Sequence, residues 1–282
     1  MISHKRRIYG IDFSGALDAG KKIWIADGAI NNGRLMIGNC ESAGDFFKAG
    51  VERDKCLRAL QEFIAVKKDC VFAFDFPFGL PVARAVADSV QLVQEKTWED
   101  FILHFSKHYK NHHDFRTKCR KINNNMELKR MTDKWCGTPF SPYNLRVYKQ
   151  TFYGINNILR PLVQEQKVCV LPMQAACPDK PWIIEICPAS TLKSLFNLKR
   201  LFSYKGGTTN HDTARERILT TIEREGLYIL EETLRKKILK ERSGDALDSV
   251  IAAYAGFRAL NDPSFLLIRE NTTIMIEGHV FC

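Results

Sequence analysis

The sequence predicts an α/β fold in which helices flank one mixed β-sheet, and three observations support this class. The chain opens with three short strand-like runs separated by turn residues, which indicates an antiparallel meander. A helical pattern and then a continuous apolar run follow, which is typical of a crossover into a parallel strand. Near the end, residues 243–256 form a helix that is apolar on nearly every side and is therefore expected to be buried.

The first half of the sheet follows from turn signals and periodicity. Strands are predicted over 7–15, 22–30 and 33–39, a helix over 54–68, and a strand buried on both faces over 70–76. If the fourth strand lies parallel to the first and beside it, Asp12 and Asp75 come together. Both lie near the carboxyl ends of their strands, where open α/β sheets build their sites.

The middle of the chain is helical and basic, and we interpret residues 82–168 as an insertion within one domain of residues 1–282. Helices are predicted over 97–109 and 147–163. Between residues 104 and 150 there are eleven Lys or Arg against three acids, a difference of +8 in a chain whose formal net charge is +10. Aromatic and histidine side chains are interleaved with these charges. One interpretation is a surface that neutralises phosphates and stacks on bases; the alternative is a solvated helical lid.

The second half offers another strand and three helices. Residues 182–188 form an apolar strand interrupted by Glu185, either a functional acid or, on an edge strand, an acid that points to water. A helix is predicted from Pro188, a Gly-rich loop over 204–211, amphipathic helices over 213–226 and 230–240, and a terminal pair of strands over 265–282.

Two acids near the start of the buried helix suggest a functional site. Asp245 and Asp248 lie three residues apart on the buried helix and can approach a common point; alternatively, Ser243 is the N-cap and Asp245 only complements the helix dipole. Buried carboxylates that converge repel one another, so they should hold protons or bind cations. Oxygen ligands favour Mg²⁺ or Mn²⁺, and two such ions can promote phosphodiester cleavage.

Hydropathy, the first residues and the cysteines bear on the cellular location of the protein. No apolar run approaches the length of a membrane span, and the first residues lead directly into a strand with no signal-peptide pattern. The nine cysteines are scattered without a C-x-x-C pair, so we expect reduced thiols rather than a disulfide framework. These features predict a cytoplasmic, intracellular protein.

The order of strands and acids resembles the ribonuclease H-like superfamily, and Asp245-Ala-Leu-Asp-Ser-Val-Ile-Ala-Ala253 resembles the terminal-helix motif of its Holliday-junction resolvases. Four motifs are similar to domain-of-unknown-function family 429 (DUF429), described as predicted nucleases: Gly10-Ile-Asp-Phe-Ser-Gly-Ala16, Ala73-Phe-Asp-Phe-Pro-Phe-Gly-Leu-Pro81, Glu185-Ile-Cys-Pro-Ala189 and Gly244-Asp-Ala-Leu-Asp-Ser-Val-Ile-Ala-Ala253.

This resemblance implies a five-stranded sheet of order 3-2-1-4-5 and a metal-dependent nuclease that acts on nucleic acid. It also implies that Asp245 either shares a metal or supports its ligands. The implied metal ligands are Asp12, Asp75, Glu185 and Asp248.

Other functions stay open. Actin-like ATP-dependent phosphotransferases begin similarly, but they need a duplicated domain and a second Gly-rich phosphate hairpin, and the sequence shows neither. A noncatalytic nucleic-acid-binding protein and a hydrolase of small phosphorylated metabolites are further alternatives. His211 is either a mobile acid that protonates a leaving group or a solvent-exposed loop residue. Candidates for substrate contacts are Asn144, Arg146, Lys193 and Lys205.

Overall fold

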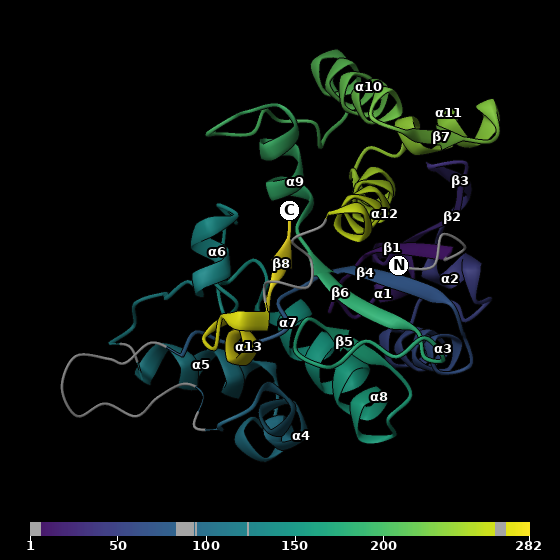
Figure 1. Ribbon diagram of the computed structural model, residues 1–282. Helices are drawn as coiled ribbons and strands as arrows, with labels where there is room; N and C mark the ends of the chain where they lie inside the picture. Colours follow the sequence, from purple (N-terminus) through teal and green to yellow (C-terminus); the bar gives the residue numbers. More distant parts are fainter. Residues whose placement is uncertain (1–6, 83–92, 94, 123, 263–268) are drawn as a thin grey trace.

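A mixed β-sheet flanked by helices forms the centre of the molecule (Figure 1). The computed structural model describes residues 7–82, 93, 95–122, 124–262 and 269–282. Within that part of the chain the sheet has eight strands in the order β5-β6-β4-β1-β2-β3-β7, and β8 pairs with β6. The predicted sheet of five strands in the order 3-2-1-4-5 is therefore not the observed one, because three further strands extend it.

The opening meander is confirmed. Strands β1 (Arg7–Asp12), β2 (Trp24–Asn31) and β3 (Arg34–Ser42) pair antiparallel in sequence. A two-residue loop joins β2 to β3, and its residues Asn32 and Gly33 have φ angles of 48° and 73°. An Asn-Gly pair with both φ values positive is the preferred tight hairpin turn, which sets the register of the two strands.

The crossover after the meander is confirmed as well. Short helix α1 (Ala19–Lys22) lies between β1 and β2, and after β3 the chain continues through α2 (Ala43–Phe46) and α3 (Arg53–Ala65) into β4 (Cys70–Asp75). Strand β4 lies parallel to β1, and Asp12 and Asp75 are direct register partners. The predicted neighbours are thus adjacent at the carboxyl ends of both strands.

The other strands are shorter. Strand β6 (Trp182–Ile186) lies parallel to β4, and β5 (Cys169–Leu171) and β8 (Val280–Phe281) both pair with β6, while β7 (Leu227–Ile229) extends β3. The interpretation of β6 as a solvent-facing edge strand is wrong, because β6 is an inner strand and Glu185 is buried.

Helices cover both faces of the sheet. Helix α12 (Asp245–Asn261) lies across one face, and α7 (Tyr148–Gly154), a π-helical turn η1 (Ile155–Leu159) and α8 (Arg160–Gln164) lie on the opposite side (Figure 1). With α4 (Trp98–His108) and α5 (His112–Ile122) they enclose a core rich in phenylalanine. Part of the predicted basic insertion therefore supplies core for the sheet.

Helix α12 rests directly on strand β1. A Cβ atom at Gly10 would lie 2.1 Å from the Ser249 carbonyl oxygen and 2.2 Å from the Ala253 nitrogen. Only glycine allows two backbones to approach so closely. This contact fixes the height of the helix above the carboxyl end of β1.

Of the remaining helices, α9 (Pro188–Leu195), α10 (Thr209–Arg224) and α11 (Glu232–Lys240) pack against α12, and α6 (Met131–Trp135) packs against α13 (Ile274–Glu277). Among the described residues, none of the helices has both the length and the apolar character needed to cross a membrane.

Three local predictions need correction. The predicted Gly-rich loop ends early, because α10 begins at Thr209 with Thr208 as its N-cap. The predicted terminal pair of strands is instead α13 followed by β8, and residues 263–268 of that segment lie outside the described residues. A disulfide joins Cys136 to Cys282, although reduced thiols were expected.

Candidate active site

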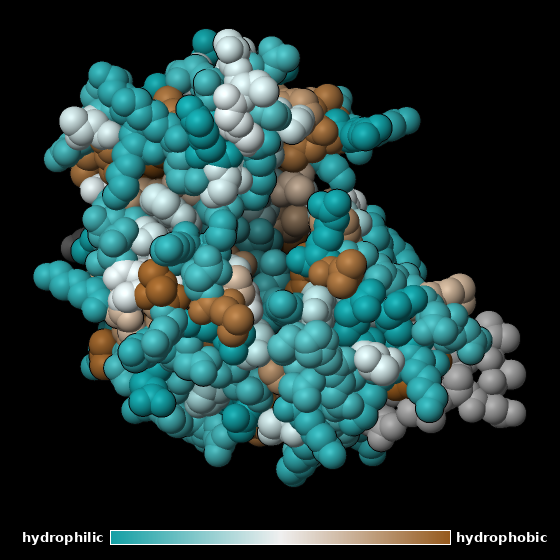
Figure 2. Space-filling model, turned by 180° about the vertical axis from the view of Figure 1, so that it is seen from behind, coloured by the Kyte–Doolittle hydropathy of each residue, from teal (hydrophilic) through white to brown (hydrophobic). Residues whose placement is uncertain are grey.

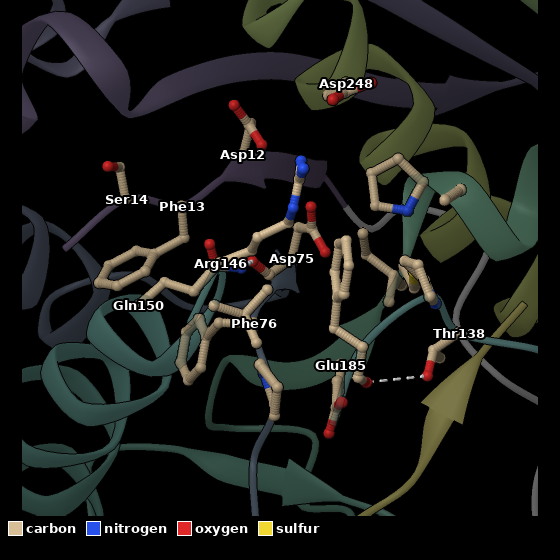
Figure 3. Close-up of a pocket in the computed structure, with 18 of the residues that line it drawn as sticks. Asp12, Phe13, Ser14, Asp75, Phe76, Thr138, Arg146, Gln150, Glu185 and Asp248 are labelled. Atoms are coloured by element: carbon tan, nitrogen blue, oxygen red, sulfur yellow. Dashed lines mark hydrogen bonds between the residues drawn. The ribbon is translucent and has the colours of Figure 1, made fainter. Parts of the chain in front are cut away.

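Three aspartates from separate elements meet above the carboxyl ends of β1 and β4 (Figure 3). Side chains alternate along a strand, and Gly10 faces α12, so Asp12 two residues later faces α12 too. Asp75 is the register partner of Asp12 and shares this face. Asp248, in the first turn of α12, completes the group. Asp12 and Asp248 are buried, with Asp248 only 3% exposed, and Asp75 is partly buried.

Burial and mutual repulsion make it costly to ionise all three side chains. Burial raises the pKa of Asp12 well above its ordinary value, and the nearby Asp248 carboxylate raises it further. The same two causes raise the pKa of Asp75 to about 8. Burial also raises the pKa of Asp248, although Lys205 and Tyr204 partly oppose this. A group of this kind holds protons or attracts a cation.

Asp248 already has two partners from the loop before α10. The Tyr204 hydroxyl donates a hydrogen bond of 2.6 Å to Asp248 Oδ1, and Lys205 Nζ lies 2.5 Å from Asp248 Oδ2. Lys205 Nζ is 3.9 Å from Asp245 Oδ1. The sequence indicates Lys205 only as a candidate for substrate contact and gives no sign of Tyr204, because nothing local marks a loop that reaches another element.

Asp245 lies at the margin of the group. Its side chain is 16% exposed, more than that of Asp248. The alternative in which Ser243 caps the helix is wrong: Gly244, with φ of 84°, is the N-cap residue, and the Ser243 hydroxyl donates to Glu241. Asp245 still lies in the first turn, where a negative charge complements the helix dipole.

Glu185 points to the other face of the sheet. Its register partner is Phe74, whose side chain packs in the core opposite α12. There Arg130 donates to both Glu185 carboxylate oxygens at 2.5 and 2.8 Å, and to Asp133 at 2.9 and 3.0 Å. The Phe78 amide also donates to Glu185. Burial raises the pKa of Glu185, and the Arg130 guanidinium opposes that rise.

One cavity of about 650 Å³ nevertheless brings all five predicted acids to a common space. Figure 3 shows Asp248 and Asp12 in its upper part, Asp75 at its centre and Glu185 below Asp75. Basic side chains also line it: Lys22, Arg130, Arg146 and Lys205. Arg146 extends toward the space between Asp12 and Asp75 (Figure 3).

The donor chemistry of the three aspartates suits a hard divalent cation, because carboxylate oxygens are the ligands that Mg²⁺ and Mn²⁺ prefer. In the described part of the chain, no group of three or more His, Cys, Asp or Glu side chains stands in a metal-binding arrangement. As the side chains stand, the Lys205 ammonium neutralises part of the group. The residues therefore fit the ion by type, and they need a local rearrangement to coordinate it.

The basic segment contributes both surface and core. Phe115 and Tyr143, two of the aromatics interleaved with the charges, are buried in the core, whereas Trp135 is 63% exposed. Figure 2 shows one face of the molecule, which is mostly hydrophilic with small separate apolar groups and is hollowed between its upper and lower parts. The Arg116 and Arg146 guanidinium groups lie over the rings of Tyr148 and Phe140.

Other sequence candidates have structural partners. His211 belongs to a capping box with Thr208 at the start of α10, and its ring also contacts the Ser203 hydroxyl. Asn144 donates to Glu127, and Lys193 donates to the Gly137 carbonyl oxygen. None of the three lines the cavity.

No family model matches the chain. No curated protein matches it either. One similar solved structure is the yeast mitochondrial Holliday junction resolvase Ydc2, with 11% sequence identity, a TM-score of 0.42, and coverage of 96% of this chain and 86% of that chain.

Proposed function

We propose that this protein is a divalent-metal-dependent nuclease that hydrolyses phosphodiester bonds of nucleic acid. One observation carries the proposal: aspartates from β1, β4 and α12, two of them buried and one partly buried, converge at one cavity that basic side chains also line. Acidic groups in such a place attract cations, and basic groups beside them attract phosphates. The resemblance of the sequence motifs to ribonuclease H-like nucleases agrees with this chemistry.

Within this proposal, Asp12, Asp75 and Asp248 would hold Mg²⁺ or Mn²⁺, and Asp245 would share an ion or orient a ligand. Glu185 remains a fourth proposed ligand, whose oxygens would first have to leave Arg130. A bound pair of such ions supplies activation of water and stabilisation of the leaving oxygen.

The chain's own basic groups would bind and orient the substrate. Arg146 and Lys22 line the same cavity as the aspartates, where each can contact a phosphate oxygen. We propose residues 82–168 as an insertion within the single domain. Exposed lysines of this insertion extend the positive charge over the surface; they include Lys107, Lys110, Lys118, Lys121 and Lys149. Neutralising several phosphates in this way makes affinity fall steeply with salt.

A second candidate is the hydrolysis of a small phosphorylated metabolite. A volume of about 650 Å³ lies within the usual range for pockets that enclose a small ligand. The same aspartates would serve either substrate, so only a substrate assay separates the two functions.

The test combines metal binding with cleavage. Mn²⁺ is titrated by calorimetry into the wild type and Asp12→Asn, and both are assayed on labelled single-stranded, duplex, hybrid and branched substrates. We expect the wild type to bind Mn²⁺ and cleave at least one substrate, and the variant to lose both. A wild type that binds Mn²⁺ and cleaves none of them would favour the metabolite, and a wild type that binds no Mn²⁺ would contradict the enzyme.

A further inference from the structure

Lys205 places a permanent positive charge among the proposed metal ligands. Its Nζ is 2.5 Å from Asp248 Oδ2 and 3.9 Å from Asp245 Oδ1, on the α12 side of the group. An ammonium at this distance makes a charge-assisted hydrogen bond to the same oxygen that would coordinate a metal ion. Lysine and a divalent ion therefore compete for one place.

The backbone around Lys205 is held in a defined position. Arg215 is fully buried, and its Nη1 donates to the carbonyl oxygens of Tyr204 at 2.7 Å and Gly206 at 2.9 Å, on either side of Lys205. The Gly206 amide donates to the Arg242 carbonyl oxygen at 2.8 Å. These hydrogen bonds hold the main chain on both sides of Lys205, so the position of its Cα atom is fixed.

The side chain of Lys205 is also given room. Gly244, the N-cap residue of α12, has φ of 84°, and a Cβ atom there would lie 2.9 Å from Lys205 Cγ and 3.3 Å from Cε. Glycine therefore permits both the turn into α12 and the path of the lysine stem. The Lys205 side chain is 47% exposed, which leaves it a route back to solvent.

We propose that Lys205 is a positioning residue that occupies the second cation place of the site, so that the free protein takes up divalent ions at Asp12 and Asp75 more readily than at Asp245 and Asp248. This inference rests on the proposed function, because it concerns metal uptake by the same aspartates. The two ions of the proposed reaction would then differ in affinity, and the second would have to displace the ammonium.

The experiment is a calorimetric titration of Mn²⁺, without nucleic acid, into four proteins: the wild type, Lys205→Met, Lys205→Arg and Lys199→Met. Lys205→Met keeps most of the stem volume and removes the charge. Lys199 is exposed and lies outside the cavity, so Lys199→Met controls for the change in net charge. Circular dichroism and urea unfolding confirm that each variant is folded.

We expect Lys205→Met to bind one more Mn²⁺ per chain than the wild type, or to bind Mn²⁺ at least tenfold more tightly. Lys205→Arg and Lys199→Met should match the wild type. Equal stoichiometry and affinity in all four proteins, or weaker binding by Lys205→Met, would overturn the role of Lys205 and leave the proposed function intact. No binding by any of the four would instead contradict the proposed function.

Discussion

Replacing Arg130 with methionine tests whether the ion network beside the cavity holds this part of the fold together. Arg130 is 1% exposed, and it neutralises two carboxylates that are almost as deeply buried. Removing the cation leaves Glu185 and Asp133 without their counter-charge. Breaking a buried pair by removing one partner typically costs about 3–5 kcal/mol, so we expect Arg130→Met to lose about that much stability.

The free energy of unfolding is measured by urea denaturation, with the midpoint and the slope both fitted. Arg7→Met is the matched control, because Arg7 also pairs with a carboxylate, Asp27, but is 58% exposed. Surface pairs contribute about 0–1 kcal/mol, so this variant should lose no more than that. Glu185→Gln removes one of the two buried carboxylates that Arg130→Met leaves without a counter-charge. The double variant Arg130→Met/Glu185→Gln should therefore lose less stability than the sum of the single losses.

A loss below about 1 kcal/mol in Arg130→Met, with an unchanged slope, would refute this reasoning. It would mean that water or a protonated carboxyl compensates the missing guanidinium. Additive losses in the double variant would refute the pairing of Arg130 with Glu185 in particular.

Three further predictions concern the carboxylate group and the helix above it. Asp12→Asn should abolish Mn²⁺ binding, whereas Glu185→Gln should change it less than tenfold, because Arg130 already occupies the Glu185 oxygens; calorimetry measures both. Burial raises the pKa of Asp75 to about 8, so the folded, metal-free protein keeps a proton that the unfolded chain loses near pH 4. Its stability should fall between about pH 4 and 8, by up to about 1.4 kcal/mol per pH unit, and Asp75→Asn should flatten this slope in thermal melts. Gly10→Ala should lower the free energy of unfolding, measured with urea, by about 1–3 kcal/mol or more, because its Cβ would overlap the backbone of α12.

Each of these predictions has a result that contradicts it. Equal loss of Mn²⁺ affinity in both carboxylate variants would make Glu185 a ligand of the same rank as Asp12. A metal-free stability that stays constant or rises over that pH range would contradict the raised pKa of the Asp75 carboxyl. An unchanged midpoint in Gly10→Ala would show that α12 can shift away from β1 without cost.

Local patterns in the sequence were sufficient to predict the two strands and the helix that carry Asp12, Asp75 and Asp248. The Asn32-Gly33 turn set the hairpin, and the apolar run before Asp75 predicted a parallel neighbour for β1. Strands β5, β7 and β8 have only two or three residues, too few for a period of two to be recognised. The short apolar segment at Ile274 is compatible with strand or helix for the same reason.

The partners of the acids were not predictable from local sequence. All five residues of β6 are buried, so no alternation of polar and apolar side chains shows which face Glu185 takes. That face follows from register with β4, which is a tertiary property. Arg130 reaches Glu185 across 55 residues of the chain, and Lys205 reaches Asp248 across 43, and no spacing rule links such positions.

The contact between β1 and α12 also bears on how the molecule reaches its native state. Asp12 belongs to the first strand and Asp248 to a helix that begins at Asp245, so these two side chains can meet only after a very long loop has closed. Closing long loops is slow, since their entropy is lost before the distant contact forms. The acidic centre should consequently be among the last features to mature during folding, and partly folded chains should lack the proposed metal site even when most of their sheet is present.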